Sequence, residues 1–346
     1  MQFILFIIIL AVLILVHEGG HFVIGKKCGI GVEQFNIGFG PKIISRRHNG
    51  TEYNLRVLPF GGNCIFEGYD GEDDSDSPTS FINAPVWARF ATVAAGPIMN
   101  FVLAFFLSLF VIGSVGYDPP VLADIIEGYP AEEAGLASGD EIIALNGHRI
   151  SLYRDVSTYL FFHEGESVDV RYKRDGLFYD TRIDPRYDPE EGRYLLGILG
   201  GQRVKGNWIQ TIRYSVSEVR YWIEITVKSL LQVFKGRVSK DDLTGPVGVA
   251  GVVGEVYEES KSEGFFVVWL NMLQLMILLS ADLGVMNLLP FPALDGGRLV
   301  FMLIEAVTGK GVDRRVEAGF HFFGMCCLLL LMIFVMYNDI TRIIGR

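Results

Sequence analysis

The amino-acid sequence predicts a polytopic α-helical membrane protein that carries one inserted polar domain. Of its 346 residues, 50% are apolar and only 20% are charged, and the mean hydropathy is +0.33. The apolar residues gather in long uncharged blocks, and a polar segment separates the second block from the third. The net charge of −10, with no dominant basic patch, argues against nucleic acid as a partner.

Four blocks are long enough to cross a bilayer as helices, which takes about 20 residues. They cover residues 3–24, 90–116, 264–289 and 318–337. The first block reaches this length only with a polar interruption near its end included. An α-helix satisfies its own backbone hydrogen bonds, so such a block is stable in contact with lipid. We therefore expect four transmembrane helices in a lipid bilayer.

Lysine and arginine are unevenly distributed between the predicted spans. They concentrate in loops 25–88 and 290–316, whereas the segment before the first span has none. Basic loops tend to stay in the cytoplasm, which places both termini and the insert at about 117–263 outside it. The acidic stretch Glu67–Asp76 is then expected to be a solvated cytoplasmic loop.

The insert begins with a small β-rich domain at 117–200. Asn146-Gly147 lies between apolar stretches, as in a two-residue hairpin, and the segment 168–172 alternates as a strand does. Residues 201–263 are expected to form amphipathic helices, either on the outer membrane surface or packed against this domain. The expected division is an N-terminal membrane domain (1–116), the β-domain (117–200), a helical linker (201–263) and a C-terminal membrane domain (264–346).

The polar interruption of the first predicted span reads His17-Glu18-Gly19-Gly20-His21. This is the H-E-x-x-H pattern on a predicted helix, where residues i and i+4 lie on one face. Two imidazoles so placed can bind one Zn²⁺ ion, and the glutamate beside them can act as a general base. Ionisable side chains inside an apolar span are costly and are usually functional. We therefore predict a zinc site with His17 and His21 as ligands and Glu18 as the catalytic base.

A zinc hydrolase site needs a third protein ligand, and Asp295 is the candidate that we favour. The third span runs in the same direction as the first, so its exit reaches the depth of the two histidines near the cytoplasmic leaflet. Pro290 and Pro292 interrupt the helix before Asp295, and two glycines after it allow close approach of the backbone. The other candidates for this ligand are Asp282, Glu67, His48 and His321.

Several motifs together resemble one known family. They are HEGGH in the first span, Gly96-Pro97-Ile98-Met99-Asn100 in the second, Gly245 to Ala250 in the linker, and Asn287 to Gly296 at the exit of the third span. The series Ala134-Gly135-Leu136, Gly139-Asp140 and Asn146-Gly147 resembles a bacterial PDZ domain. The chain thereby resembles the site-2 protease family, and within it the RseP/RasP-like bacterial regulated intramembrane zinc metalloproteases with one PDZ domain.

The resemblance implies an intramembrane zinc endopeptidase in a bacterial inner membrane, with Zn²⁺ as its cofactor. His17, His21 and Asp295 match the metal ligands of the family, and Glu18 matches its catalytic glutamate. Substrates would be single-span membrane proteins already trimmed outside the cell, such as anti-sigma factors and remnant signal peptides. The PDZ domain would bind peptide C-termini by strand addition. The fold would combine four transmembrane helices, a cytoplasmic-side membrane-associated β-hairpin and an inserted extracytoplasmic PDZ domain.

Residues 30–66 resemble the membrane-associated β-hairpin of this family. Alternating apolar residues precede a predicted turn at Gly40-Pro41, and a second alternating stretch ends at Gly61-Gly62. An edge strand there would capture an unwound substrate by strand addition, and an ordinary cytoplasmic hairpin is the alternative. A helix–helix hydrogen bond is the alternative role for Asn100. The residues that we expect to bind substrate are Asn100, Asn287, Gly61 and Gly62.

Two positions depart from the family pattern. Gly19 stands where a bulkier residue is common, which lowers helix propensity, and Asp282 stands where asparagine is expected. Two other function classes make different predictions. A non-catalytic, membrane-anchored PDZ peptide sensor predicts no bound zinc and no effect of changing Glu18. A membrane-anchored zincin that cuts soluble peptides predicts a metal site outside the bilayer. A transporter is disfavoured because the sequence shows no internal repeat.

Overall fold

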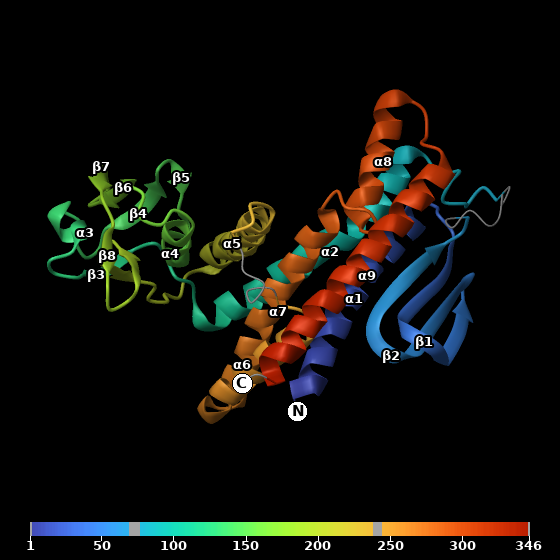
Figure 1. Cartoon of the computed structure of the whole chain (residues 1–346), viewed down its shortest axis with the longest axis horizontal. Coiled ribbons are helices and arrows are strands. Elements are labelled where there is room, and N and C mark those ends of the chain that lie inside the picture. Colours follow the sequence, from blue (N-terminus) through green and yellow to red (C-terminus); the bar gives the residue numbers. More distant parts are fainter. Residues whose placement is uncertain (1, 69–76, 238–243, 345–346) are drawn as a thin grey trace. The chain divides into compact units, whose positions relative to one another are not determined.

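The chain folds into two compact units in the computed structural model, which describes residues 2–68, 77–237 and 244–344 (Figure 1). The membrane unit comprises Met1–Leu107 and Thr226–Arg346, and the insert unit comprises Ser108–Ile225. Of the predicted acidic loop, residues 69–76 lie outside the described residues.

Four long helices occupy the four predicted spans: α1 (Gln2–Lys27), α2 (Val86–Val115), α7 (Phe265–Leu288) and α9 (Arg314–Ile344). Each contains a stretch long and apolar enough to cross a membrane. Helix α7 is the most enclosed, with 44% of its apolar window buried, whereas only 6% of the window of α9 is buried. Helix α9 therefore presents most of its apolar surface outward, as a lipid-facing helix does.

Two shorter helices complete the packing of the membrane unit. Helix α6 (Pro246–Ser260) packs against α1 and α7, where Val253 joins a core with Ile9 and Leu13. Helix α8 (Asp295–Thr308) occupies a segment for which the sequence suggested only a turn. That expectation was wrong because a proline ends the preceding helix without preventing a new one from starting just after it.

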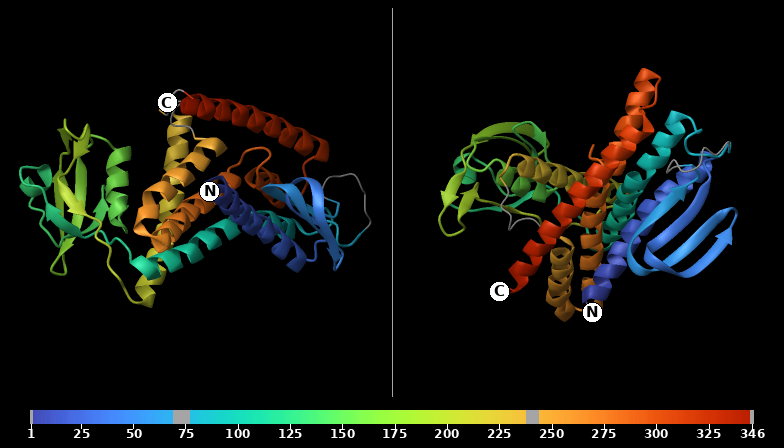
Figure 2. Two further views of the ribbon diagram at one scale, coloured as in Figure 1. Left: turned by 90° about the horizontal axis from the view of Figure 1, so that it is seen from below. Right: turned by 45° about the vertical axis from the view of Figure 1, so that its right-hand side comes forward.

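Strands β1 (Val32–His48) and β2 (Thr51–Phe66) form a strongly bent hairpin beside α1 (Figure 2). The chain first reverses near Gly38 and Gly40, which both have a φ of 87°, because segments 32–37 and 42–48 run in opposite directions beside 52–55. It reverses again at Asn49-Gly50. The predicted turn at Gly40-Pro41 is therefore confirmed, and the Asn-Gly pair supplies the backbone of the tight turn that joins β1 to β2.

The bend gives the hairpin four strand segments. Segment 32–37 pairs antiparallel with 62–66, and it also pairs with 52–55, where both residue numbers rise together as in parallel strands. Segment 42–48 pairs antiparallel with 51–56, on the edge of that segment opposite to 32–37. Segment 62–66 is therefore an edge of this sheet, and β2 packs against α1.

The insert unit is built around a four-stranded sheet with the order β5-β4-β6-β7. Its core gathers apolar side chains of the alternating strand 168–174, as predicted, together with residues of β4 and β7. The predicted hairpin at Asn146-Gly147 is confirmed by the pair Leu145↔His148 and by φ values of 47° and 77°. The elements are β3 (Leu122–Ile125), α3 (Pro130–Glu133), β4 (Glu141–Leu145), β5 (His148–Arg149), α4 (Tyr153–Phe162), β6 (Val168–Arg174), β7 (Leu177–Ile183), β8 (Arg186–Asp188), β9 (Arg193–Leu195) and β10 (Ile198–Gly200).

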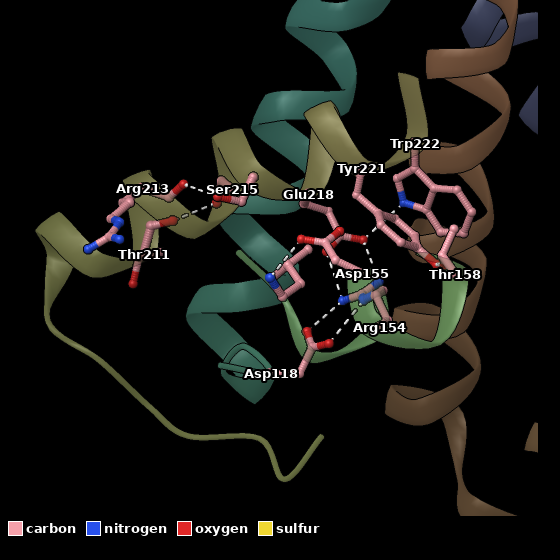
Figure 3. Close-up of polar contacts among 12 residues, drawn as sticks. Asp118, Arg154, Asp155, Thr158, Thr211, Arg213, Ser215, Glu218, Tyr221 and Trp222 are labelled. Carbon is pink, nitrogen blue, oxygen red and sulfur yellow. Dashed lines mark hydrogen bonds and ion pairs between the residues drawn. The ribbon is translucent and has the colours of Figure 1, made fainter. Parts of the chain in front are cut away.

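Helix α5 (Trp208–Phe234) packs on α4 through a buried polar cluster, which we call the arginine cluster (Figure 3). The Arg154 guanidinium donates to both carboxylate oxygens of Asp118, at 3.1 and 2.7 Å, and to Oε1 of Glu218 at 2.9 Å. The indole of Trp222 donates to the same Glu218 oxygen at 2.9 Å. The sequence allowed two placements of this linker, on the outer membrane surface or packed on the inserted domain. The linker residues up to Ile225 belong to the insert unit, as the second placement predicts.

Candidate active site

Three predicted metal ligands meet at one point of the membrane unit. His17 and His21 project from one face of α1, and Asp295 is the first residue of α8. The Nε2 atoms of the two histidines lie 3.3 Å apart. Oδ2 of Asp295 lies 3.2 Å from Nε2 of His17 and 3.3 Å from Nε2 of His21. Both histidines are 7% exposed, so this meeting point is shielded from bulk water.

The donor atoms fit a zinc ion. Ligands about 2.0–2.1 Å from a tetrahedral zinc are separated from each other by about 3.3 Å, which is the spacing of these three atoms. Oδ2 of Asp295 is buried and has no hydrogen-bond donor among the described residues. A cation would satisfy both the two imidazole nitrogens that face each other and the carboxylate oxygen that has no donor.

The backbone before and after Asp295 is shaped by the residues that flank it. Helix α7 ends at Leu288, and Ala293 adopts a φ of 73° just before the aspartate. A Cβ added at Gly296 would lie 2.2 Å from the Leu289 carbonyl oxygen, and one at Gly297 would lie 2.4 Å from that of Phe291. The expectation that the two glycines allow a close backbone approach is confirmed.

Glu18 lies beside the edge of the bent hairpin. Its Cγ would be 3.4 Å from a Cβ added at Gly62, and its carboxylate interacts with the backbone of Cys64 and with both histidines. A narrow cleft is lined by Ala11, Ile14, Leu15, Glu18, Phe35, Asn36, Ile37, Gly61 and Gly62. The structure thus brings two predicted substrate-binding glycines next to the predicted catalytic base.

The other two predicted substrate-binding residues, Asn100 and Asn287, are not among the residues that line this cleft. Asn100 is fully buried, and its amide lies 3.1 Å from Nδ1 of His17. The Asn287 amide donates to the Leu283 carbonyl oxygen of its own helix at 3.0 Å. A role of either residue in substrate binding stays a prediction.

The rival third ligands do not join the histidines. Glu67 accepts a hydrogen bond from Thr79, and Asp282 accepts one from Thr226 of α5. His321 accepts the backbone N–H of Ala293 at 2.9 Å, and His48 ends strand β1. Over the described residues, the group of His, Cys, Asp or Glu side chains with ligand atoms within 4.8 Å of one another is His17, His21 and Asp295.

Helix α2 makes contacts with the two histidines that the sequence analysis did not predict. The Thr92 carbonyl oxygen lies 2.9 Å from Nδ1 of His21. A Cβ at Gly96 would lie 2.3 Å from Nε2 of the same histidine, so only glycine lets α2 pass this close. Together with Asn100 these residues are spaced four apart on one helical face, and this spacing was the available signal. Gly20 is needed for the same packing, because its Cβ would lie 2.4 Å from the Ala95 carbonyl oxygen.

Comparison with known proteins shows the family to which the chain belongs. The model of peptidase family M50 matches residues 5–331. A protein of Clostridium acetobutylicum that carries the name of a zinc metalloprotease is 35% identical over 335 residues, covering 97% of this chain and 96% of that one. The zinc metalloprotease RasP of Geobacillus kaustophilus is 30% identical, covering 97% of both chains. The regulator of sigma-W protease RasP of Bacillus subtilis is 29% identical, covering 98% of both chains.

Among solved structures, the chain is similar to the PDZ domain of an SdrC-like protein from Listeria monocytogenes, at 22% identity and a TM-score of 0.23. That similarity covers 25% of this chain and 90% of the other. The family match over most of the chain and the near-complete overlap with its relatives agree with the zinc-binding chemistry of the site. The chain therefore belongs to peptidase family M50, and it is a zinc metalloprotease of the site-2 protease type.

Proposed function

We propose that the protein hydrolyses peptide bonds within transmembrane segments of single-span membrane proteins. The observation that carries this proposal is the place of His17, Glu18 and His21 inside α1, a helix apolar enough to span a bilayer. Two histidines and a glutamate in such a helix are expensive unless they do chemistry there. The third proposed ligand, Asp295, reaches them from a separate helix.

In the proposed reaction, Glu18 removes a proton from the attacking water and then delivers it to the leaving amine. His17, His21 and Asp295 would hold the ion by their Nε2 and Oδ2 atoms. Zinc, when bound, supplies a Lewis acid that polarises the scissile carbonyl and makes water acidic near neutral pH. Placement of Glu18 directly after His17 keeps the base next to the reacting centre throughout.

Substrate presentation is assigned to the bent hairpin. A transmembrane helix hides its carbonyl groups in its own hydrogen bonds, so it must unwind before its bonds can be cut. The edge segment 62–66 lies beside Glu18, and an extended chain added to this edge would run past the base. Gly61 and Gly62 line the same cleft as Glu18.

The insert unit is proposed to be an extracytoplasmic PDZ domain that binds peptide C-termini. Its sheet and its Asn146-Gly147 hairpin are compatible with this assignment. The basic residues of loops 25–88 and 290–316 support placing both termini and the insert outside, with the active site near the cytoplasmic leaflet. The name of the Bacillus subtilis relative refers to sigma-W regulation, which supports anti-sigma factors as substrates, and remnant signal peptides are a second class.

Cleavage of a model transmembrane peptide by the reconstituted protein tests the proposal. Glu18→Gln is expected to retain zinc and to abolish cleavage, because it keeps the shape of the side chain but cannot accept the proton. Asp295→Asn is expected to lose zinc and cleavage together. Cleavage by the Glu18→Gln protein would refute the catalytic role, and a wild-type protein without zinc would favour a non-catalytic peptide sensor.

A further inference from the structure

Helix α2 lies against the Nδ1 atoms of both histidines, whose Nε2 atoms face Asp295. Nδ1 of His21 is 2.9 Å from the Thr92 carbonyl oxygen, and Nδ1 of His17 is 3.1 Å from the Asn100 amide. Asn100 is 0% exposed, so no water competes for its amide. Its own backbone carbonyl accepts a hydrogen bond from the Ser280 hydroxyl of α7 at 2.7 Å, which fixes the residue between two helices.

The chemistry of a histidine ligand decides which way this amide must point. Both Nε2 atoms face Asp295, so each must be free of a proton to bind a cation, and the single imidazole proton then sits on Nδ1. The Thr92 carbonyl accepts that proton from His21. His17 needs an equivalent acceptor, and Oδ1 of Asn100 is a buried oxygen with no partner among the described residues. With the amide turned so that Oδ1 faces Nδ1, both groups are satisfied.

We propose that Asn100 is a positioning residue that holds His17 in its metal-binding tautomer. The role rests on the proposed zinc site, and it differs from the substrate-binding role that the family resemblance suggests. The amide accepts the Nδ1 proton and leaves the Nε2 lone pair aimed at the ion. It also fixes the plane of the imidazole ring, because a hydrogen bond from Nδ1 is directional.

The test measures zinc affinity of the detergent-solubilised full chain by chelator competition. Asn100→Leu removes the acceptor at similar size and is expected to weaken zinc binding about 10–100-fold. Asn100→Asp retains an acceptor and is therefore expected to bind zinc more tightly than Asn100→Leu. Ser114→Ala is the control in the same helix, because it removes a hydroxyl that donates to the Phe110 carbonyl oxygen of α2, 14 residues along the chain from Asn100.

The absorption spectrum of the cobalt-substituted protein gives a second readout, because it reports ligand geometry independently of activity. Asn100→Leu is expected to alter the spectrum, whereas Ser114→Ala and Asn100→Asp preserve it. Unchanged zinc affinity and an unchanged cobalt spectrum in Asn100→Leu would overturn the positioning role. Failure of the wild-type chain to bind zinc would instead overturn the proposed site, so the two failures are distinguishable.

A separate observation concerns the turn that carries Asp295. Ala293 has a φ of 73°, a left-handed conformation that residues with a Cβ rarely adopt. Its N–H donates to Nδ1 of His321 on α9 at 2.9 Å. One turn further along α9, a Cβ at Gly324 would lie 2.1 Å from Pro292, so the two segments are in direct contact. The geometry points to His321 as a positioning residue that stabilises the left-handed turn before Asp295.

Rescue by glycine tests this second role. His321→Leu removes the acceptor and is expected to weaken zinc binding, because the turn then relaxes and moves Asp295. Ala293→Gly in the same chain is expected to restore much of the affinity, since glycine adopts a positive φ without steric strain. Weakened binding without rescue would show that His321 acts in another way, and unchanged binding in His321→Leu would overturn the role outright.

Discussion

The candidate metal site and the arginine cluster are both buried polar groups held between helices, but they differ in whether their atoms are paired. In the arginine cluster, the Arg154 guanidinium donates to two carboxylates, and Trp222 adds a further donor. At the metal site, two Nε2 atoms and Oδ2 of Asp295 converge, and that oxygen has no donor among the described residues. A closed cluster stabilises structure, whereas an open one is built to receive a cation.

The arginine cluster and the candidate metal site also differ in their fixed charges. Although burial opposes it, the hydrogen bond from Arg154 to Asp118 and the charge of Glu218 raise the pKa of the guanidinium above its usual range. Arg154 therefore stays charged at any ordinary pH and remains the cation of the cluster. Over the described residues, the converging ligand atoms belong to His17, His21 and Asp295, and we propose that a divalent ion completes their charge.

Breaking the closed cluster should produce the largest change in stability. Arg154→Met leaves Asp118 and Glu218 buried without their cation, and we expect the insert unit to lose about 3–5 kcal/mol of unfolding free energy. Hydrogen exchange over residues 118–162 measures this loss. The control Arg171→Met removes a pair with Asp180 whose side chains are 56% and 69% exposed, and it should cost less than about 1 kcal/mol. Equal losses in the two variants would contradict the comparison.

Removing the ion should affect the other unit. Chelation of zinc from the wild-type chain is expected to lower the stability of the membrane unit by about 4 kcal/mol when the free metal had been a thousandfold above its Kd. Faster hydrogen exchange is expected around His17, His21 and Asp295, because only these residues lose a shared ligand. Exchange in the arginine cluster should not change, and a uniform change over both units would argue against a local site.

Two adjacent glycines of α1 test how tightly the metal site is packed. Gly20→Ala places a Cβ 2.4 Å from the Ala95 carbonyl oxygen, and we expect a loss of about 1–3 kcal/mol together with weaker zinc binding. Gly19 has nothing within 4 Å of its added Cβ, so Gly19→Ala should stabilise the helix by up to about 1 kcal/mol. Thermal unfolding and chelator competition measure both effects, and similar results for the two variants would contradict the packing of α1 on α2.

Much of the candidate metal site could be predicted from the sequence because the positions of its two histidines are local information. His17 and His21 are one helical turn apart, and the apolar run around them identified the helix before any packing was known. Asp295 was reachable through the depth at which the third span ends. The helix that begins at Asp295 was missed, because the prolines before it indicated only where α7 stops.

The supporting groups could not be predicted because they depend on how helices pack. Asn100 is 83 residues from His17, and only the rotation of α2 about its axis decides whether its amide meets His17 or a substrate. The bond from Ala293 to His321 depends in the same way on the position of α9. Asp282 looked anomalous in the sequence, and its partner Thr226 lies on a helix whose position no motif reveals.

The smallest expected effect is the pH dependence of the arginine cluster. Burial raises the pKa of the Glu218 carboxyl above its ordinary value of 4.5, although Arg154 and Trp222 act in the opposite direction. The folded chain then holds this proton more tightly than the unfolded chain, so the stability that it contributes is complete below about pH 4.5 and is lost as pH rises through the raised value. Glu218→Gln should flatten that part of the stability profile of the insert unit, and exposed Glu164→Gln should leave it unchanged. A Glu218→Gln profile with the wild-type slope would show that another group in the cluster, such as Asp155, takes up the proton, since burial raises the pKa of that carboxyl as well.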